Sequence, residues 1–117
     1  MREINKIHQL ISSARLDLSD EKRTQNDLAE VFTAHGVDFD RECRLSPGDI
    51  PDFMIEGMAV EVKLRGARKK DVFKQLERYA RHDRVTAIML VTNLTMGLPA
   101  TLGGKPVYFL ALGRAWL

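Results

Sequence analysis

Three charged residues in the middle of the chain have types and spacing suited to phosphodiester chemistry: Asp52, Glu61 and Lys63. Two carboxylates suit Mg²⁺, which prefers hard oxygen ligands and keeps several of its waters. Such an ion neutralises phosphate charge and lowers the pKa of an attacking water. A nearby ammonium can orient or deprotonate that water, or stabilise the developing negative charge. The alternative is an ordinary cross-strand salt bridge of Lys63, worth under about 1 kcal/mol on an exposed face.

A strand hairpin must position these residues. We expect strands over 52–55 and 58–64, joined by a tight turn. Side chains alternate along a strand, so Glu61 and Lys63 share the face opposite the core, and Asp52 lies across the hairpin. The three charged groups are therefore expected on one surface patch of the sheet.

The rest of the pattern predicts one α/β domain over residues 1–117, with a mixed central β-sheet flanked by helices. Ser19 is expected to cap the second helix and Gly36 to end it. The segment 93–105, rich in Gly and Pro, is expected to be irregular. In the strand over 37–45, alternate residues should share one side: Phe39, Arg41, Cys43 and Leu45. The other expected elements are helices over 3–16, 19–35 and 69–82, and strands over 86–92 and 107–112.

The composition is that of an ordinary globular chain, with 44% hydrophobic and 29% charged residues among 117. The apolar runs are too short to cross a bilayer, and the amino terminus lacks a signal pattern. Cys43, the single cysteine, excludes an internal disulfide and is expected to be a buried thiol. We therefore expect a reduced, cytoplasmic protein without a membrane partner.

Charge is unevenly distributed along the chain. The net charge is +2, yet the segment 63–84 holds nine basic residues against three acidic ones. A basic segment beside an acidic remainder suits a phosphate-backbone partner. A solvated Lys/Arg-rich helix is an equally good interpretation of this feature alone.

The motifs resemble those of a known family. Ile50-Pro51-Asp52-Phe53, a turn at Gly57 and Val60-Glu61-Val62-Lys63 resemble the PD-(D/E)XK nuclease motif. The segment 75–79 is similar to the Gln-x-x-x-Tyr signature of the RecB-like branch. The resemblance covers about residues 20–92 and implies a restriction-endonuclease-like core in the order α-α-β-β-β-α-β-β. The small size is also similar to the virus-type replication-repair nucleases of phages and mobile elements, so both branches stay open.

The resemblance also implies a metal site. Asp52, Glu61 and the main-chain carbonyl of Val62 would bind Mg²⁺, for which Mn²⁺ would substitute, and Lys63 would serve the nucleophilic water. No organic cofactor is implied.

Gln75 and Tyr79 would, by the same resemblance, line the DNA-facing side of the site. The helical pattern places Gln75 one turn from Tyr79, at the margin of the buried stripe, where a polar side chain needs a partner. A hydrogen bond from Gln75 to a main-chain carbonyl is the alternative.

The family often adds an acid from the helix that precedes the sheet, and here the match is not clear. Glu21 and Gln25 share the helix face of the apolar residues, whereas Glu30 falls on the opposite face. Glu21 and Gln25 are therefore the candidates. Glu21 also suits the first helical turn for reasons of charge alone.

These residues together favour a Mg²⁺-dependent DNA endonuclease, acting on branched DNA or junctions and leaving 5′-phosphate and 3′-hydroxyl ends as the resemblance implies. The candidate phosphate contacts are Lys69, Lys70, Lys74, Arg78 and Arg81. One site cuts one strand, so cutting both would call for a homodimer. The segment ending Ala115-Trp116-Leu117 is a candidate for its interface, or packs on its own core. The alternatives are a non-catalytic nucleic-acid-binding or assembly module with this fold, and a phosphohydrolase acting on RNA.

Overall fold

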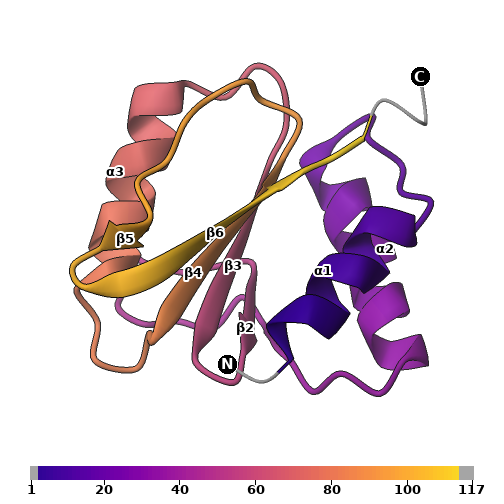
Figure 1. The fold of residues 1–117 in the computed structure, drawn as a ribbon, viewed down its shortest axis with the longest axis horizontal. Helices are drawn as coiled ribbons and strands as arrows, with labels where there is room; N and C mark the ends of the chain where they lie inside the picture. The colour runs from indigo at the N-terminus through magenta and orange to yellow at the C-terminus, as the bar shows by residue number, and fades with distance from the viewer. Residues whose placement is uncertain (1–2, 114–117) are drawn as a thin grey trace.

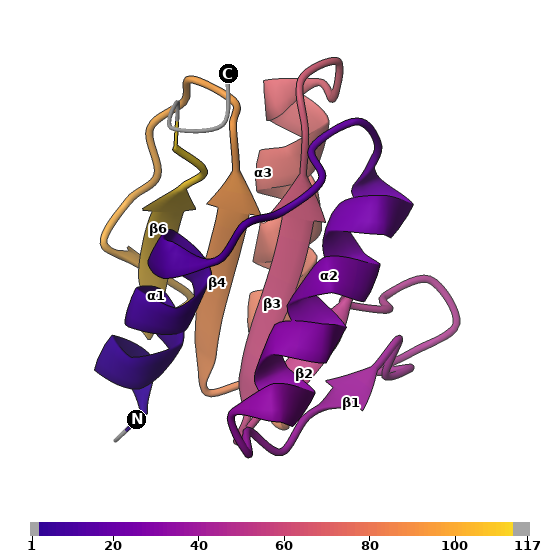
Figure 2. The same ribbon diagram turned by 90° about the vertical axis from the view of Figure 1, so that its right-hand side faces the viewer.

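A computed structural model describes residues 3–113 as three layers, with a sheet between helices (Figures 1 and 2). Helices α1 and α2 cover one face of the sheet and α3 covers the other (Figure 2). The helices are α1 (Ile4–Ser13), α2 (Glu21–Ala34) and α3 (Lys69–Ala80). The strands are β1 (Asp40–Arg41), β2 (Phe53–Ile55), β3 (Met58–Lys63), β4 (Ala87–Thr92), β5 (Thr101–Leu102) and β6 (Lys105–Ala111). The predicted α/β class with a mixed sheet flanked by helices is confirmed.

The sheet has six strands in the order β1-β2-β3-β4-β6-β5. β1, β2 and β3 pair antiparallel, β3, β4 and β6 run parallel, and β5 pairs antiparallel with β6. The carboxyl ends of the three parallel strands therefore lie at one edge, where α2 and α3 both begin (Figure 2). In open α/β sheets this edge is where ligands usually bind.

The hairpin of β2 and β3 forms as the sequence predicts. Ile55 pairs with Met58, and the two residues between them have positive φ, 48° at Glu56 and 84° at Gly57. A Cβ added at Gly57 would lie 2.6 Å from Oγ1 of Thr86, so glycine is required there. The turn fixes the register that sets Asp52 near Glu61.

Both faces of β3 are buried, contrary to the expected surface patch. Met58, Val60 and Val62 pack under α1 and α2, while Ala59 packs under α3. Glu61 points to the α3 side and is only 3% exposed. The alternation is as predicted, but helix α3 covers the face that carries the charged residues.

The strand expected over 37–45 is wrong in extent, because only Asp40 and Arg41 pair with β2. Glu42 has a φ of 50°, which turns the chain out of the extended conformation. Before this turn, Phe39 packs on the α2 side, against Phe32 and Phe53. Two of the residues expected beside it pack on the α3 side instead: Cys43 and Leu45.

Other details of the elements also differ from the sequence prediction. The first helix is shorter than residues 3–16, and the last strand begins at Lys105. Asp20 caps α2 in place of Ser19, its side chain accepting a hydrogen bond from the Arg23 N–H. The expected irregular connection contains β5, which forms a hairpin with β6 through Gly103 and its neighbour, both at positive φ. The predicted interface segment 115–117 lies outside the described residues.

Within the described chain, 3–113, no helix combines the length and apolar character needed to cross a bilayer.

Candidate functional site

The hairpin brings Asp52, Glu61 and Lys63 into one hydrogen-bonded group. Oδ2 of Asp52 accepts a hydrogen bond from the Val62 N–H over 2.8 Å. The Asp52 N–H in turn donates to Oε1 of Glu61 over 3.3 Å, and Nζ of Lys63 lies 3.2 Å from Oε2 of the same carboxylate. The Lys63 side chain is 20% exposed and that of Glu61 is 4% exposed, so only the lysine of this pair reaches towards solvent.

The electrostatics of this group follow from two neighbouring acids, of which Glu61 is buried and Asp52 partly buried. Burial, and then the nearby charge of Glu61, raise the pKa of Asp52 to about 7. Burial also raises the pKa of Glu61, against the opposing effects of Lys63 and Tyr79. For Lys63, burial alone would lower the pKa, but the charges of the surrounding carboxylates outweigh it and raise the pKa. The lysine is therefore an ammonium at neutral pH.

Helix α3 supplies the group that fixes Glu61. The Tyr79 hydroxyl donates to Oε1 of Glu61 over 2.9 Å, and Nε2 of Gln75 donates to the Tyr79 oxygen over 2.9 Å. Burial and the charge of Glu61 raise the pKa of Tyr79 well above its usual range, so the phenol keeps its proton. Gln75 thus has a side-chain partner, and the predicted alternative of a main-chain carbonyl does not describe it.

Helix α2 brings Glu21 to the same end of β3. Its Oε2 accepts a hydrogen bond from the Leu64 N–H over 3.1 Å. The charge of Glu21 also contributes to the raised pKa of both Asp52 and Lys63. Gln25 is buried one turn further along α2, whereas Glu30 is exposed on the opposite face, as the helical spacing predicts.

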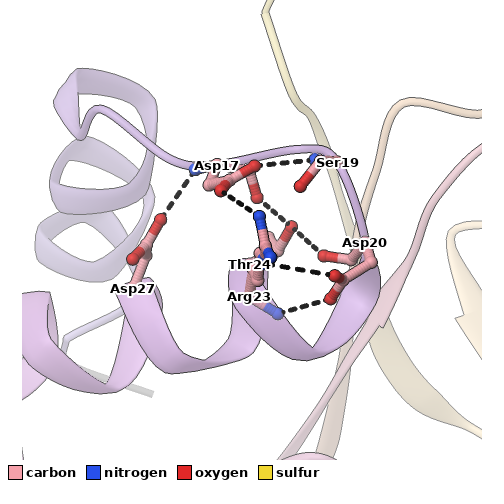
Figure 3. A network of polar contacts seen from close by, with 6 residues as sticks. All are labelled: Asp17, Ser19, Asp20, Arg23, Thr24 and Asp27. Carbon is pink, nitrogen blue, oxygen red and sulfur yellow. Dashed lines mark hydrogen bonds and ion pairs between the residues drawn. The ribbon is translucent and has the colours of Figure 1, made fainter.

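A closed network holds the start of α2 in place (Figure 3). Oγ1 of Thr24, which is fully buried, donates to the carbonyl oxygens of Asp17 and Asp20 over 2.7 and 3.1 Å. The Asp17 N–H donates to Oδ2 of Asp27 over 2.7 Å. Hydrogen bonds from Ser19, then burial and the Arg23 charge acting in opposite senses, leave the pKa of Asp17 lowered. The network ties the segment before α2 to the helix and so fixes the position of the first helical turn, which carries Glu21.

A groove of about 310 Å³ opens between Lys63 and α3, and we call it the β3–α3 groove. Asp71 is the acidic residue of its lining, and Gln75 also faces it. Four basic side chains line it: Lys63, Arg68, Lys74 and Arg78. A groove with this excess of positive charge, lined by the lysine that contacts Glu61, suits a phosphate group.

Asp49 organises one end of this groove, and the sequence reasoning missed it. Oδ1 of Asp49 accepts a hydrogen bond from Nε of Arg78 over 3.0 Å, and Oδ2 lies 2.8 Å from Nε2 of His82. The hydrogen bond with His82 is the largest cause of a lowered pKa at Asp49. Asp49 sits in a turn of ordinary composition, so no local signal distinguishes it. The contact ties the loop that carries Asp52 to the end of α3.

The other predicted phosphate contacts are divided between surfaces. Lys69 and Lys70 are exposed on α3 and line a second groove together with Lys74. Arg81 is exposed at the C-cap of α3 and does not line either groove. The five candidate phosphate contacts therefore do not form one continuous surface.

The donor set fits a divalent cation that completes its shell from elsewhere. No group of three or more His, Cys, Asp or Glu side chains within residues 3–113 is arranged to hold a metal ion. Asp52 and Glu61 present two acidic side chains against the single positive charge of Lys63, so a cation would relieve their repulsion. Mg²⁺ is commonly bound by one or two carboxylates, with waters and substrate oxygens as its other ligands.

Comparison of the chain with protein-family models, with curated proteins and with solved structures finds no match.

Proposed function

We propose that this protein is a Mg²⁺-dependent phosphodiesterase that cuts the backbone of DNA, with Asp52, Glu61 and Lys63 as its active residues. One observation carries the proposal. The buried Glu61 carboxylate accepts a hydrogen bond from the main-chain N–H of Asp52, whose own partly buried carboxylate is held by the Val62 N–H. Lys63, in contact with Glu61, lines a basic groove. A purely structural ion pair would need neither the second acid beside it nor the groove, and unpaired charge is costly where solvent is largely excluded.

The fold gives this proposal further support. The run α2, β1, β2, β3, α3, β4 is similar to the order expected of a restriction-endonuclease-like core. The residues that resemble the PD-(D/E)XK motif lie on β3 and just before β2, and Gln75 and Tyr79 lie on α3 in contact with that motif through Glu61. We therefore propose the restriction-endonuclease-like core and the PD-(D/E)XK-like active site together.

Each residue has a distinct part in the proposed reaction. Asp52, Glu61 and the main-chain carbonyl of Val62 would hold the ion. When bound, Mg²⁺ supplies charge neutralisation at the phosphate and a more acidic water. Lys63 stays charged next to Glu61, so it stabilises negative charge that develops on the phosphate rather than removing a proton from water.

Helix α3 would position Glu61 and the substrate. Tyr79 occupies Oε1 of Glu61 and keeps its proton, which leaves Oε2 for Lys63 and the ion. Gln75 fixes the Tyr79 hydroxyl and faces the groove itself. Arg68, Lys74 and the Asp49-anchored Arg78 would contact phosphates on either side of the cut.

The proposal is tested by incubating plasmid DNA, branched DNA and RNA of matched sequence with the protein and Mg²⁺. We expect DNA cleavage by the wild type, and its loss in Asp52→Ala and in Lys63→Ala. Lys6→Ala, at an exposed position on α1, is the matched control and should cut normally. Absence of cutting on every substrate, or full activity in both site variants, would overturn the proposal.

A further inference from the structure

A second groove, of about 670 Å³, lies on the next face of α3. We call it the α3–loop groove, because α3 forms one wall and residues 95–97 form the other. Phe73 and Met96, both half-buried, give it an apolar floor. Its charged residues are Lys69, Lys70, Lys74 and one acid, Glu77. Its volume falls within the range of about 300–1,000 Å³ typical of sites for small organic groups.

The two grooves are continuous in their lining. Lys74 lines both the α3–loop groove and the β3–α3 groove, so this side chain lies on the ridge of α3 between them. A nucleic-acid strand whose phosphate contacts Lys74 can thus enter either groove without leaving the protein surface. Aromatic and apolar side chains beside lysines are suited to binding single-stranded nucleic acids, because bases stack on aromatic rings while lysines contact the phosphate backbone. A paired base has both faces stacked already and gains nothing from Phe73.

We propose that the α3–loop groove binds an unpaired nucleotide, with its base against Phe73 and Met96 and its phosphates against Lys69 and Lys70. This inference rests on the proposed function, because the same strand would continue past Lys74 to the β3–α3 groove. It deepens that function by naming the substrate class: DNA with an unpaired segment next to the phosphodiester that is cut.

The test is binding without cleavage. Fluorescence anisotropy is measured with a labelled oligothymidylate and with a labelled duplex of the same length, in EDTA and at fixed salt. We expect Phe73→Leu to weaken single-strand binding about tenfold and to leave duplex binding within about twofold. Lys70→Ala should weaken single-strand binding and lower its salt dependence by about one counterion.

Two controls are matched by residue type. Phe109→Leu removes an exposed phenylalanine on β6, and Lys6→Ala removes an exposed lysine on α1; both should bind the single strand as the wild type does. Because Phe73 is half-buried, its variant is used only if circular dichroism and melting match the wild type. The Lys70 variant, at an exposed position, tests the inference in either case.

Three results would overturn the inference: no single-strand binding by the wild type, equal binding by groove and control variants, or equal weakening for duplex and single strand. A change in sedimentation of Phe73→Leu with unchanged strand binding would also overturn it, because the groove would then serve a second protein chain. The outcome is separable from that of the proposed function, since binding in EDTA needs neither the ion nor cleavage. Duplex cleavage with Mg²⁺ and no single-strand preference would leave the function standing and remove this inference alone.

Discussion

The Tyr79 hydroxyl donates a hydrogen bond to Oε1 of Glu61 over 2.9 Å, although the two residues lie on different elements. Both side chains are buried, and Gln75 donates to the same tyrosine oxygen. The contact joins α3 to β3 at the point where the candidate active site meets the basic groove. It turns a strand carboxylate into a group of fixed orientation, with its second oxygen towards Lys63.

Tyr79→Phe tests this contact. The variant keeps the ring in its buried place and removes the hydroxyl, which leaves Glu61 without one donor. We expect urea denaturation to show a loss of about 1.5–3 kcal/mol in the free energy of unfolding, as for a hydrogen bond to a charged group. Tyr108→Phe, a half-buried tyrosine of β6, is the control and should change it by less than about 1 kcal/mol. Equal losses in the two variants would refute the assigned role.

The raised pKa of Asp52 predicts how stability changes with pH. Its pKa of about 7 in the folded protein exceeds the ordinary 3.8, so the folded state retains a proton that the unfolded chain has lost. The free energy of unfolding that this group contributes therefore falls as pH rises from about 4 to about 8. Asp52→Asn lacks this titration and should gain on the order of 2–4 kcal/mol over wild type at pH 8 relative to pH 4, in metal-free buffer.

The matched control for the pH series is Asp83→Asn, at an exposed position. It should follow the wild-type curve at every pH. A constant difference between wild type and Asp52→Asn across the series would contradict a shifted Asp52.

Divalent ions should stabilise the protein through the same carboxylates. In differential scanning fluorimetry at pH 8, Mg²⁺ or Mn²⁺ should raise the melting temperature; an ion at about 100 times its Kd adds about 2.7 kcal/mol. The effect should shrink towards pH 6, since protonation of Asp52 competes with the ion. Glu61→Gln should abolish the shift, whereas Glu30→Gln, at an exposed position of α2, should retain it. A shift that survives in Glu61→Gln would place the ion elsewhere.

The network at the start of α2 predicts a local effect on the site (Figure 3). Thr24→Val removes the buried hydroxyl that donates to Asp17 and should cost about 1 kcal/mol. With the start of α2 loosened, the amide hydrogen of Leu64, which is bonded to Glu21, should exchange faster. Thr33→Val, at an exposed position in the same helix, should leave both quantities unchanged. Slow Leu64 exchange in Thr24→Val would show that Glu21 is held by other means.

The parts of the site that sequence could predict are those set by local periodicity. Period two along β3 puts Glu61 beside Lys63, and helical spacing puts Gln75 one turn from Tyr79. The burial of Glu61 could not be predicted in this way, because it depends on how α3 crosses the sheet. Contacts between distant segments were beyond local reasoning for the same reason, as Asp49 with His82 shows.

The same distinction, between features set by local patterns and features set by distant contacts, applies to the fold. The hairpin, α3 and β4 have strong local patterns and form within a few residues of the predicted boundaries. The alternation from Phe39 to Leu45 predicted a long strand, yet Glu42 adopts a positive φ, for which glutamate gives no sequence signal. β5 is two residues long and forms only because β6 offers a partner.

The most direct test of the central claim is the single-turnover rate of cleavage of a labelled DNA substrate in Mg²⁺. We predict that Lys63→Met slows cleavage about 10²–10³-fold, as expected for loss of a group that stabilises transition-state charge, and that Lys6→Met cuts at the wild-type rate. Glu61→Gln should reduce the rate at least as much. Wild-type rates in both Lys63→Met and Glu61→Gln would contradict an active site built on these residues.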